Sequence, residues 1–556
     1  MTKNPNPLQP LLPKHQKTIK RVLLISAVLF LAAAFSLSTW FANYYNINNA
    51  DYVVYPQLFG QFQSGDIIFP GQHSNFLKFP LYALQSVMPY NELTLSIVNI
   101  GTHALAVLSW ALLLVWVFGR KYLIPICIAL GSLLVSSQLL ALDFVGNTLR
   151  NIEFPIVFAF SALVVQTMLY GFYHSKLLYV MLGVLFSATV AGDSFFMYTV
   201  PFALLCLTLI LAIKRLVTRN NLLRGALVLL ASLTLAYIFR ASVQPLGLGI
   251  YYTDPSFTTT LAPLDHIIAS LKIVVKQLFE LAGVDHDTPS LATTPLNVIN
   301  FFVLSAGVVG LAWSIIAFLK PGTNRSVKKI TLRETMVVFA SLWFFIILAI
   351  YIFSGLVVTK LPDGSFVSSH QSRYIVILPY IALFGFLYAL SKCKPRNTAT
   401  FCSLASVLVL LSLPFLHQLF NYPRYGLSER VAIQKVARYI DKNDVDILVS
   451  GYWYGAPVRF WSQNKDLHIA SVFGCNAASP NFNVRKSWYA PSEKPVRSSL
   501  VVATQGLDAN MVDCPEEAVR ATYGIPRSQK QIKAGANEAT VYTYDYDLRQ
   551  KIINRP

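Results

Sequence analysis

Long apolar stretches alternate with short polar connections between residues 22 and 420. Eleven of them are long enough, or nearly so, to cross a hydrocarbon core of about 30 Å as a helix. Their bounds are 22–42, 93–118, 122–142, 154–173, 177–191, 195–213, 222–239, 298–319, 336–358, 374–390 and 398–420. The stretch 177–191 is the weakest, with only 15 residues. The pattern predicts an all-α polytopic membrane protein with about 11 transmembrane helices.

After residue 420 the apolar runs shorten and charged residues become frequent. Residues 427–440 have the spacing of an amphipathic helix, residues 446–452 and 499–504 are predicted to be buried strands, and residues 539–546 a late strand. We therefore expect residues 421–556 to form a small α/β domain.

A further helix is predicted between the seventh and eighth apolar stretches. Residues 264–282 carry apolar side chains at helical spacing, with Lys272, Lys276 and Glu280 between them. This pattern is typical of a helix that lies on the membrane surface. A helix packed on other loops would show the same pattern, so both interpretations stay open.

Composition agrees with a membrane protein, because 54% of the residues are hydrophobic and only 13% are charged. The net charge of +19 could indicate a nucleic-acid partner, but cytoplasmic loops of membrane proteins also collect Lys and Arg. With the amino terminus inside, the inner segments before residue 421 hold 20 cationic residues and the outer ones seven. This asymmetry fits the positive-inside rule, and we expect no nucleic-acid partner.

The same alternation sets the domain layout. Residues 1–21 form a basic cytoplasmic tail, and the first apolar stretch is predicted to be a retained signal anchor rather than a cleaved signal peptide. Residues 22–420 form the membrane domain, with long outer loops at 43–92 and 240–297. The carboxyl-terminal domain, residues 421–556, is predicted outside.

The cysteines support this sidedness. Cys475 and Cys514 both lie in the predicted outer domain, whereas the other four fall in apolar stretches or on the inner side. An oxidising compartment would allow Cys475 and Cys514 to form a disulfide, the alternative being two free buried thiols. No Cys/His spacing indicates a zinc site.

Acidic residues gather on the predicted outer side. Thirteen precede residue 421, and only Glu334 among them is predicted inside. Asp51 follows the first apolar stretch, where a carboxylate at the edge of the membrane requires a partner, water or a function. Short outer turns should bring further polar residues to the same depth: Asp143, Asn147, Arg150, Asn151, Glu153 and Asp193. We expect an acidic cavity that contains a cation.

A second cationic group opens the tenth apolar stretch. His370, Arg373 and Tyr374 lie in a polar cluster there, and an Arg at the interface can bind a phosphate bidentately. An ordinary interfacial anchor is the alternative.

These groups suit transfer of a sugar from a polyprenyl phosphate. Asp51 would accept the proton of an acceptor hydroxyl as it attacks the anomeric carbon with inversion. Arg373 and Arg150 would stabilise the leaving phosphate. Glu153 or Asp193 would orient the acceptor, position Asp51 or share a divalent cation, the only cofactor that the acidic cluster suggests.

Together, an acid after the first stretch, the acidic cluster 150–153, the Arg373–Tyr374 pair and an outer α/β tail resemble the GT-C superfamily of integral-membrane glycosyltransferases. The resemblance is closest to bacterial members related to protein mannosyltransferases and the lipid A aminoarabinose transferase. It implies a polyprenyl- or dolichyl-phosphate sugar donor, a catalytic acid in the first outer loop and amphipathic helices in that loop. The active site would face the periplasm, and the acceptor would be a glycan, a lipid or a protein.

Two features qualify the resemblance. Many relatives carry an acidic pair in the first loop, whereas Asp51 is followed by Tyr52, and Asp66 lies too far along the chain to be the second member without a fold that returns it. In the tail, Trp453 lies in an aromatic segment, residues 450–455, that is similar to tails of bacterial membrane transferases. Its ring could stack on a sugar or pack in the domain core.

Two other function classes stay open. A transporter or flippase of lipid-linked sugars would also have many spans, but it would often show inverted repeats and helices broken near the bilayer middle. A polysaccharide polymerase or ligase would also act on lipid-linked sugars at the outer face, with more Arg and His in a large late loop.

Overall fold

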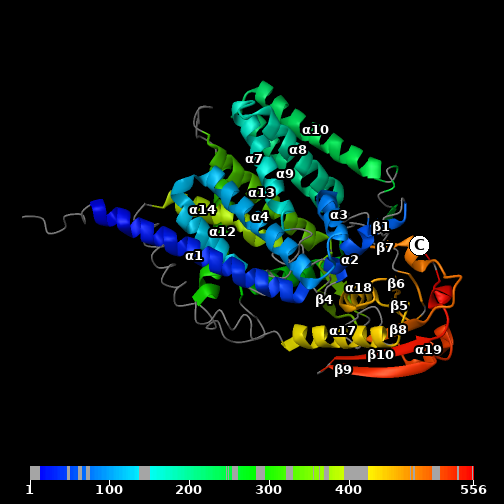
Figure 1. Cartoon of the computed structure of the whole chain (residues 1–556). Helices are drawn as coiled ribbons and strands as arrows, with labels where there is room; N and C mark the ends of the chain where they lie inside the picture. The colour runs from blue at the N-terminus through cyan, green and yellow to red at the C-terminus, as the bar shows by residue number, and fades with distance from the viewer. Residues whose placement is uncertain are drawn as a thin grey trace, which may run out of the picture.

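The computed structural model places most of the chain. It describes residues 13–46, 50–60, 65–70, 76–136, 151–243, 245, 247, 250–252, 261–283, 295–320, 330–354, 356–361, 363–368, 375–393, 424–475, 477–479, 483–503, 514–534, 537–553 and 555. The described chain forms a helical bundle and a smaller α/β tail (Figure 1).

The bundle is built from apolar helices. They are α1 (Pro13–Asn46), α4 (Glu92–Phe118), α5 (Leu123–Leu134), α7 (Glu153–Tyr170), α8 (Lys176–Gly192), α9 (Ser194–Ile213), α10 (Arg219–Val243), α12 (Pro295–Leu319), α13 (Leu332–Phe353) and α14 (Ile377–Lys392). Within the described residues, seven helices are long and apolar enough to cross a membrane, and α8 and α14 are shorter apolar helices. The predicted multi-pass membrane architecture is therefore confirmed.

Three predicted spans end differently or are not fully described. Helix α5 covers the first part of span 122–142, and residues 137–150 lie outside the described chain. Span 398–420 lies outside it entirely. Span 336–358 was predicted too long, because α13 ends at Phe353 and Val358 begins a hairpin of β3 (Val358–Lys360) and β4 (Phe366–Ser368). The β-branched run at Val357, Val358 and Thr359 favours a strand there.

Local sequence sets several helix ends. The Asn91 side chain accepts a hydrogen bond from the backbone N–H of Thr94 (3.0 Å) and so caps α4. The chain leaves α4 through Gly119, whose φ of 89° is free of steric strain only for glycine. Helices α12 and α14 approach so closely that a Cβ on Gly385 would collide with the backbone carbonyl of Gly307.

Loop 43–92 forms a layer between the bundle and the tail (Figure 1). It contains α2 (Ala50–Phe59), β1 (Ile67–Pro70), the 3-10 helix η1 (Phe76–Lys78) and α3 (Phe79–Val87). Helix α2 packs on α18 (Tyr452–Trp461) of the tail, and η1 packs on α8. The second outer loop contributes β2 (Ile250–Tyr252) and α11 (Leu264–Leu281), which confirms the helix predicted at 264–282.

One small sheet joins three segments that are far apart in sequence. Its strand order is β2-β1-β7, with β1 parallel to β2 and antiparallel to β7 (Val484–Arg485). Open strands do not cross hydrocarbon, so loops 43–92 and 240–297 and the tail lie on the same side of the membrane. Six described apolar helices separate β1 from β2, and if α5 is a crossing, this even number requires the short helix α8 to be one as well.

The tail is the predicted α/β domain. Its helices are α17 (Arg424–Lys442), α18 and α19 (Glu516–Tyr523), and its main sheet has the order β6-β5-β8-β10-β9. The strands are β5 (Ile447–Ser450), β6 (His468–Ser471), β8 (Ser498–Ala503), β9 (Ser528–Ala534) and β10 (Asn537–Tyr544). The predicted strand 446–452 is too long, because Gly451 caps α18 and Tyr452 begins that helix.

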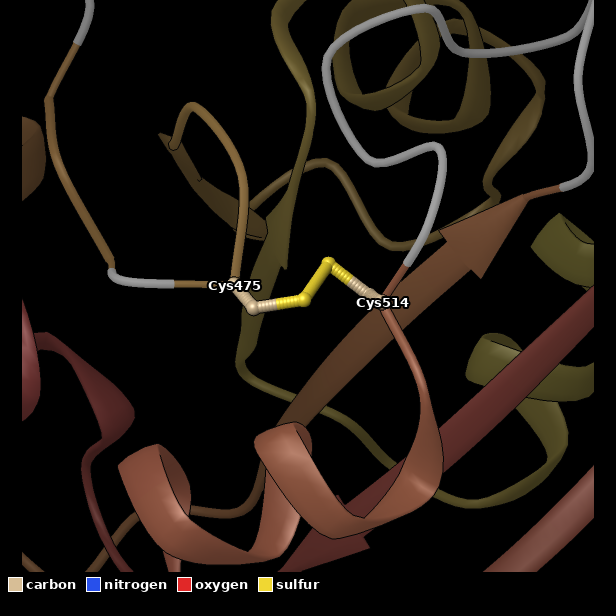
Figure 2. The surroundings of a disulfide bond; sticks show 2 residues. All are labelled: Cys475 and Cys514. Atoms are coloured by element: carbon tan, nitrogen blue, oxygen red, sulfur yellow. A yellow bond between two sulfur atoms is a disulfide. The ribbon is translucent and has the colours of Figure 1, made fainter.

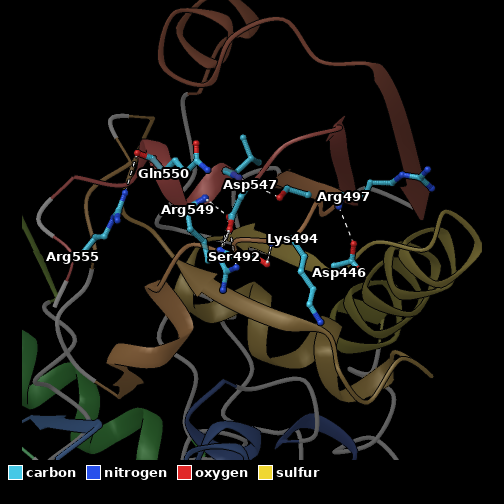
Figure 3. A network of polar contacts seen from close by, with 10 residues as sticks. Asp446, Ser492, Lys494, Arg497, Asp547, Arg549, Gln550 and Arg555 are labelled. Carbon is cyan, nitrogen blue, oxygen red and sulfur yellow. Dashed lines mark hydrogen bonds and ion pairs between the residues drawn. The ribbon is translucent and has the colours of Figure 1, made fainter.

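Cys475 and Cys514 form a disulfide, as predicted (Figure 2). Their Cα atoms are 5.4 Å apart, and the bond ties the chain after β6 to the chain before α19. A buried ion pair fixes the far end of the domain (Figure 3). There Arg549 Nη2 donates to Asp547 Oδ2 (2.8 Å), and the Ser492 N–H donates to the same oxygen (2.7 Å). Burial alone would raise the pKa of Asp547, but these hydrogen bonds hold it below its ordinary value.

Candidate active site

Asp51 lies in the first turn of α2, soon after the end of α1 at Asn46. The first turn of a helix favours a carboxylate, because the unpaired backbone N–H groups there carry partial positive charge. Helix α2 packs on α3 and on α18, so the segment that carries Asp51 is held between the bundle and the tail. The role of Asp51 as the proton acceptor stays a prediction.

Asn151 and Glu153 lie at the start of α7, the most enclosed of the seven long apolar helices. Their side chains are 0% and 1% exposed. Within the described part of the chain, neither polar atom of the Asn151 side chain has a hydrogen-bond partner. A buried amide without partners is rare in proteins, so a polar group from outside the described residues would be favourable beside it.

Asp193 lies between α8 and α9 and is 3% exposed. Its Oδ1 accepts a hydrogen bond from the Phe195 N–H (2.9 Å), so the side chain caps α9. The rings of Phe154 and Phe196 meet at 5.4 Å between centroids. The amino-terminal ends of α7 and α9, which carry Glu153 and Asp193, are therefore neighbours.

Lys78 is a buried cation that the sequence analysis did not single out. It ends η1, is 3% exposed, and enters the interior where η1 packs on α8. Helix α8 leads directly to Asp193. Lys78 is the sole Lys or Arg of loop 43–92 in the sequence. This feature could have marked Lys78 as a candidate site residue from the sequence.

Several predicted site residues are not placed. Asp143, Asn147, Arg150, His370, Arg373 and Tyr374 lie outside the described residues, so their roles stay predictions. Trp453 lies in the first turn of α18 rather than at the end of a strand. Its ring is half-buried against the tail core and contacts Tyr452 edge-on.

Three outer acids have structural partners instead of a catalytic position. Asp66 Oδ2 accepts from Arg485 Nε (2.5 Å) and from the Ser487 hydroxyl (2.7 Å). Glu92 pairs with Arg430 of α17 at 2.8 Å. Asp265 pairs with Lys360 at 3.0 Å. The one-sided distribution of acids therefore reflects contacts between outer segments as well as candidate chemistry.

An apolar groove of about 270 Å³ opens where α11, α12, α13 and α14 meet. Phe279 of α11 stacks on Phe301 of α12 beside it, with 5.8 Å between ring centroids, and Leu378 of α14 lines its wall. Leu378 lies near the start of α14, a few residues after Arg373 in the sequence. An apolar chain is the kind of ligand that such walls accept.

Among the described residues no group of three or more His, Cys, Asp and Glu side chains could hold a metal ion. Part of the predicted acidic cluster lies outside those residues, so the divalent cation stays a prediction.

Comparison with known proteins gives a fold match without a sequence match. No protein-family model matches the chain, and a search of the curated proteins gives no significant match. Among solved structures, the crystal structure of ArnT from Cupriavidus metallidurans bound to undecaprenyl phosphate matches with a TM-score of 0.52 and 10% identity. The match covers 92% of this chain and 97% of the ArnT chain. This chain has the GT-C fold.

The GT-C fold agrees with what the sequence resemblance implied. The match includes nearly all of both chains, so it extends over the outer layer and the tail as well as the bundle. Loop 43–92 contains two α-helices, α2 and α3, where the GT-C resemblance implied helices.

Proposed function

We propose that the protein is an integral-membrane glycosyltransferase. It transfers a sugar from a polyprenyl-phosphate donor to an acceptor at the outer face of the membrane in which it lies. The observation that carries the proposal is the fold match to ArnT over almost the whole of both chains. The ArnT structure is described as bound to undecaprenyl phosphate. The acceptor is a glycan, a lipid or a protein.

The donor would lie with its lipid chain in the membrane and its phosphate at the interface. The groove beside Phe279, Phe301 and Leu378 would receive the first part of the apolar chain. Arg373 and Arg150 are proposed to bind the phosphate, since guanidinium groups bind phosphate oxygens bidentately. Lys78, buried where η1 meets α8, is a third cation for the same group.

The reaction would be a single displacement. The acceptor hydroxyl attacks the anomeric carbon while Asp51 takes its proton, and the bond from that carbon to the phosphate oxygen breaks. The phosphate leaves with the electron pair, and its developing charge is stabilised by the cations. Glu153, Asp193 and Asn151 would orient the acceptor or Asp51, or bind a divalent cation. Asp143, Asn147, His370, Tyr374 and Trp453 are proposed contacts to donor or acceptor.

The test is the variant Asp51→Asn, which keeps the size of the side chain and removes the base. Purified protein in nanodiscs is incubated with radiolabelled polyprenyl-phosphate sugars and an envelope extract as acceptor. We expect transfer to fall by a factor of about 10²–10⁴, the usual contribution of a positioned general base. The control is Asp363→Asn, an exposed acid whose Oδ1 accepts from Ser365 in the turn between β3 and β4. It should retain full transfer.

Two results would contradict the proposal. Full transfer by the Asp51→Asn variant would show that Asp51 is not the general base. Movement of the labelled lipid-linked sugar across the bilayer, without transfer to any acceptor by the unaltered protein, would favour the flippase alternative.

A further inference from the structure

A second cavity lies between the first outer loop and the tail. Its volume is about 710 Å³, within the range of small-ligand sites. Gln57 and Tyr90 line it from the loop side, and Arg459, His468 and Trp488 from the tail side. None of the residues assigned to the reaction lines this cavity.

Arg459 supplies a buried positive charge. Its Nη1 is shielded from solvent and has no hydrogen-bond partner among the residues that the structure describes. The guanidinium lies 5.8 Å from the ring centroid of Trp488, which holds it by a cation–π contact. Burial lowers the pKa of Arg459, but a guanidinium stays protonated in proteins.

The other charged residues that line the cavity leave the positive charge of Arg459 largely uncompensated. Arg485 is already neutralised by Asp66, at 2.5 Å. Asp466 on the cavity wall attracts the Arg459 guanidinium, but the two form no ion pair among the described residues, and the cation Lys465 lines the same wall. A buried cation without a paired anion is costly, so an anionic ligand beside Arg459 would be favoured.

Gln57 supplies a complementary acceptor. It is 7% exposed, and its Nε2 donates to the Ala456 carbonyl (3.2 Å) and to the Tyr90 hydroxyl (2.5 Å). These two bonds fix the amide so that Oε1 is the free atom, and Oε1 has no partner among the described residues. A ligand hydroxyl would donate to it.

We propose that this cavity binds an anionic saccharide, with its carboxylate or phosphate on Arg459 and a sugar hydroxyl on Gln57. Gln57 lies in α2, six residues after Asp51, which is about 9 Å along the helix axis. The cavity would therefore hold a part of the acceptor remote from the reacting hydroxyl, and this last assignment rests on the proposed function.

Binding is measured by calorimetry on the full chain in nanodiscs, in the Asp51→Asn background so that no turnover occurs. The probes are glucuronate, glucose 1-phosphate, glucose and inorganic phosphate. We expect glucuronate and glucose 1-phosphate to bind more tightly than glucose or phosphate alone. Arg459→Gln should weaken both by about tenfold or more, the usual effect of losing a charged hydrogen bond. Arg527→Gln, an exposed Arg elsewhere in the tail, should change nothing.

A second variant keeps Arg459 in place. Ser86 of α3 lines the cavity, and Ser86→Trp would fill it and abolish binding of both anionic sugars. The proposal is overturned if Ser86→Trp binds them normally, if glucose binds as tightly, or if phosphate alone binds as tightly as glucose 1-phosphate. Because no step measures transfer, these results are independent of whether the protein is a transferase.

Discussion

Asp66 and Arg485 join the first outer loop to the tail through one buried contact. Both side chains are less than 10% exposed, and the carboxylate also accepts from the backbone N–H of Ser487 (2.7 Å). Asp66→Asn would leave a buried guanidinium uncompensated, at a cost of about 3–5 kcal/mol. We expect the strands β1 and β7 of this variant to exchange their amide hydrogens much faster, which hydrogen–deuterium exchange on the full chain would measure.

Two further variants sharpen this test. The double variant Asp66→Leu with Arg485→Met removes both charges, so it should recover most of the lost protection. Asp545→Asn breaks an exposed pair with Arg527 (2.7 Å) and should leave β1 and β7 unchanged. Normal exchange in Asp66→Asn would mean that the pair does not hold the loop on the tail.

The same pair shows what one sequence can and cannot predict about single residues. Periodicity and the edges of apolar stretches marked Asp51, Glu153 and Asp193 as acids that need an explanation. They did not separate these from Asp66, because its partner Arg485 is 419 residues away. Lys78 was missed for the same reason, since its burial depends on the packing of η1 on α8 and not on any local pattern.

At the scale of elements, the disulfide is the main covalent constraint on the tail. It closes a segment with a sequence separation of 39, and the chain-entropy model assigns about 4 kcal/mol to a loop of this size. Cys475→Ser should therefore lower the exchange protection of β8 and β10 in the full chain. Reductant should lower it in the unaltered protein and have no further effect in the variant.

A cysteine outside the tail provides the control. Cys393 is exposed and unpaired, so Cys393→Ser should leave the protection of β8 and β10 unchanged with and without reductant. If Cys475→Ser also left it unchanged, the bond would not stabilise the tail.

Elements were predicted best where periodicity was long. The amphipathic spacing at 427–440 and the helix at 264–282 correspond to α17 and α11. The predicted strand that ran to Tyr452 was too long, because the aromatic run Tyr452, Trp453 and Tyr454 has strand-like composition. Gly451 nevertheless starts a helix there, and the side chains of that helix pack against α2 and the tail core. That tertiary contact cannot be predicted from local propensity.

For the whole molecule, the β2-β1-β7 sheet tests the transmembrane count independently of charge. The positive-inside rule and the sheet both put loops 43–92 and 240–297 and the tail on one side. The short helix α8 was the weakest predicted span, and its omission would leave an odd number of crossings between β1 and β2. Length alone could not decide this point, because a shorter helix can cross where the bilayer thins or where neighbours cover its ends.

Cysteine labelling tests this arrangement in intact cells. In a background with Cys127, Cys206, Cys393 and Cys402 replaced by Ala, a single new cysteine is placed at an exposed position on each proposed side. Asn220, at the start of α10, is predicted inside, and Lys530 of β9 is predicted outside.

A membrane-impermeant maleimide should label Lys530→Cys at once and Asn220→Cys only after the cells are permeabilised. If α8 did not cross, everything after it would be inverted, and the five predicted spans between Asn220 and the tail would still keep these two positions on opposite sides. Asn220→Cys would then be labelled at once and Lys530→Cys only after permeabilisation. Because β2 follows α10 and pairs with β1, that outcome would also conflict with the sheet, so the labelling pattern bears on the fold and on the outer position of Asp51 together.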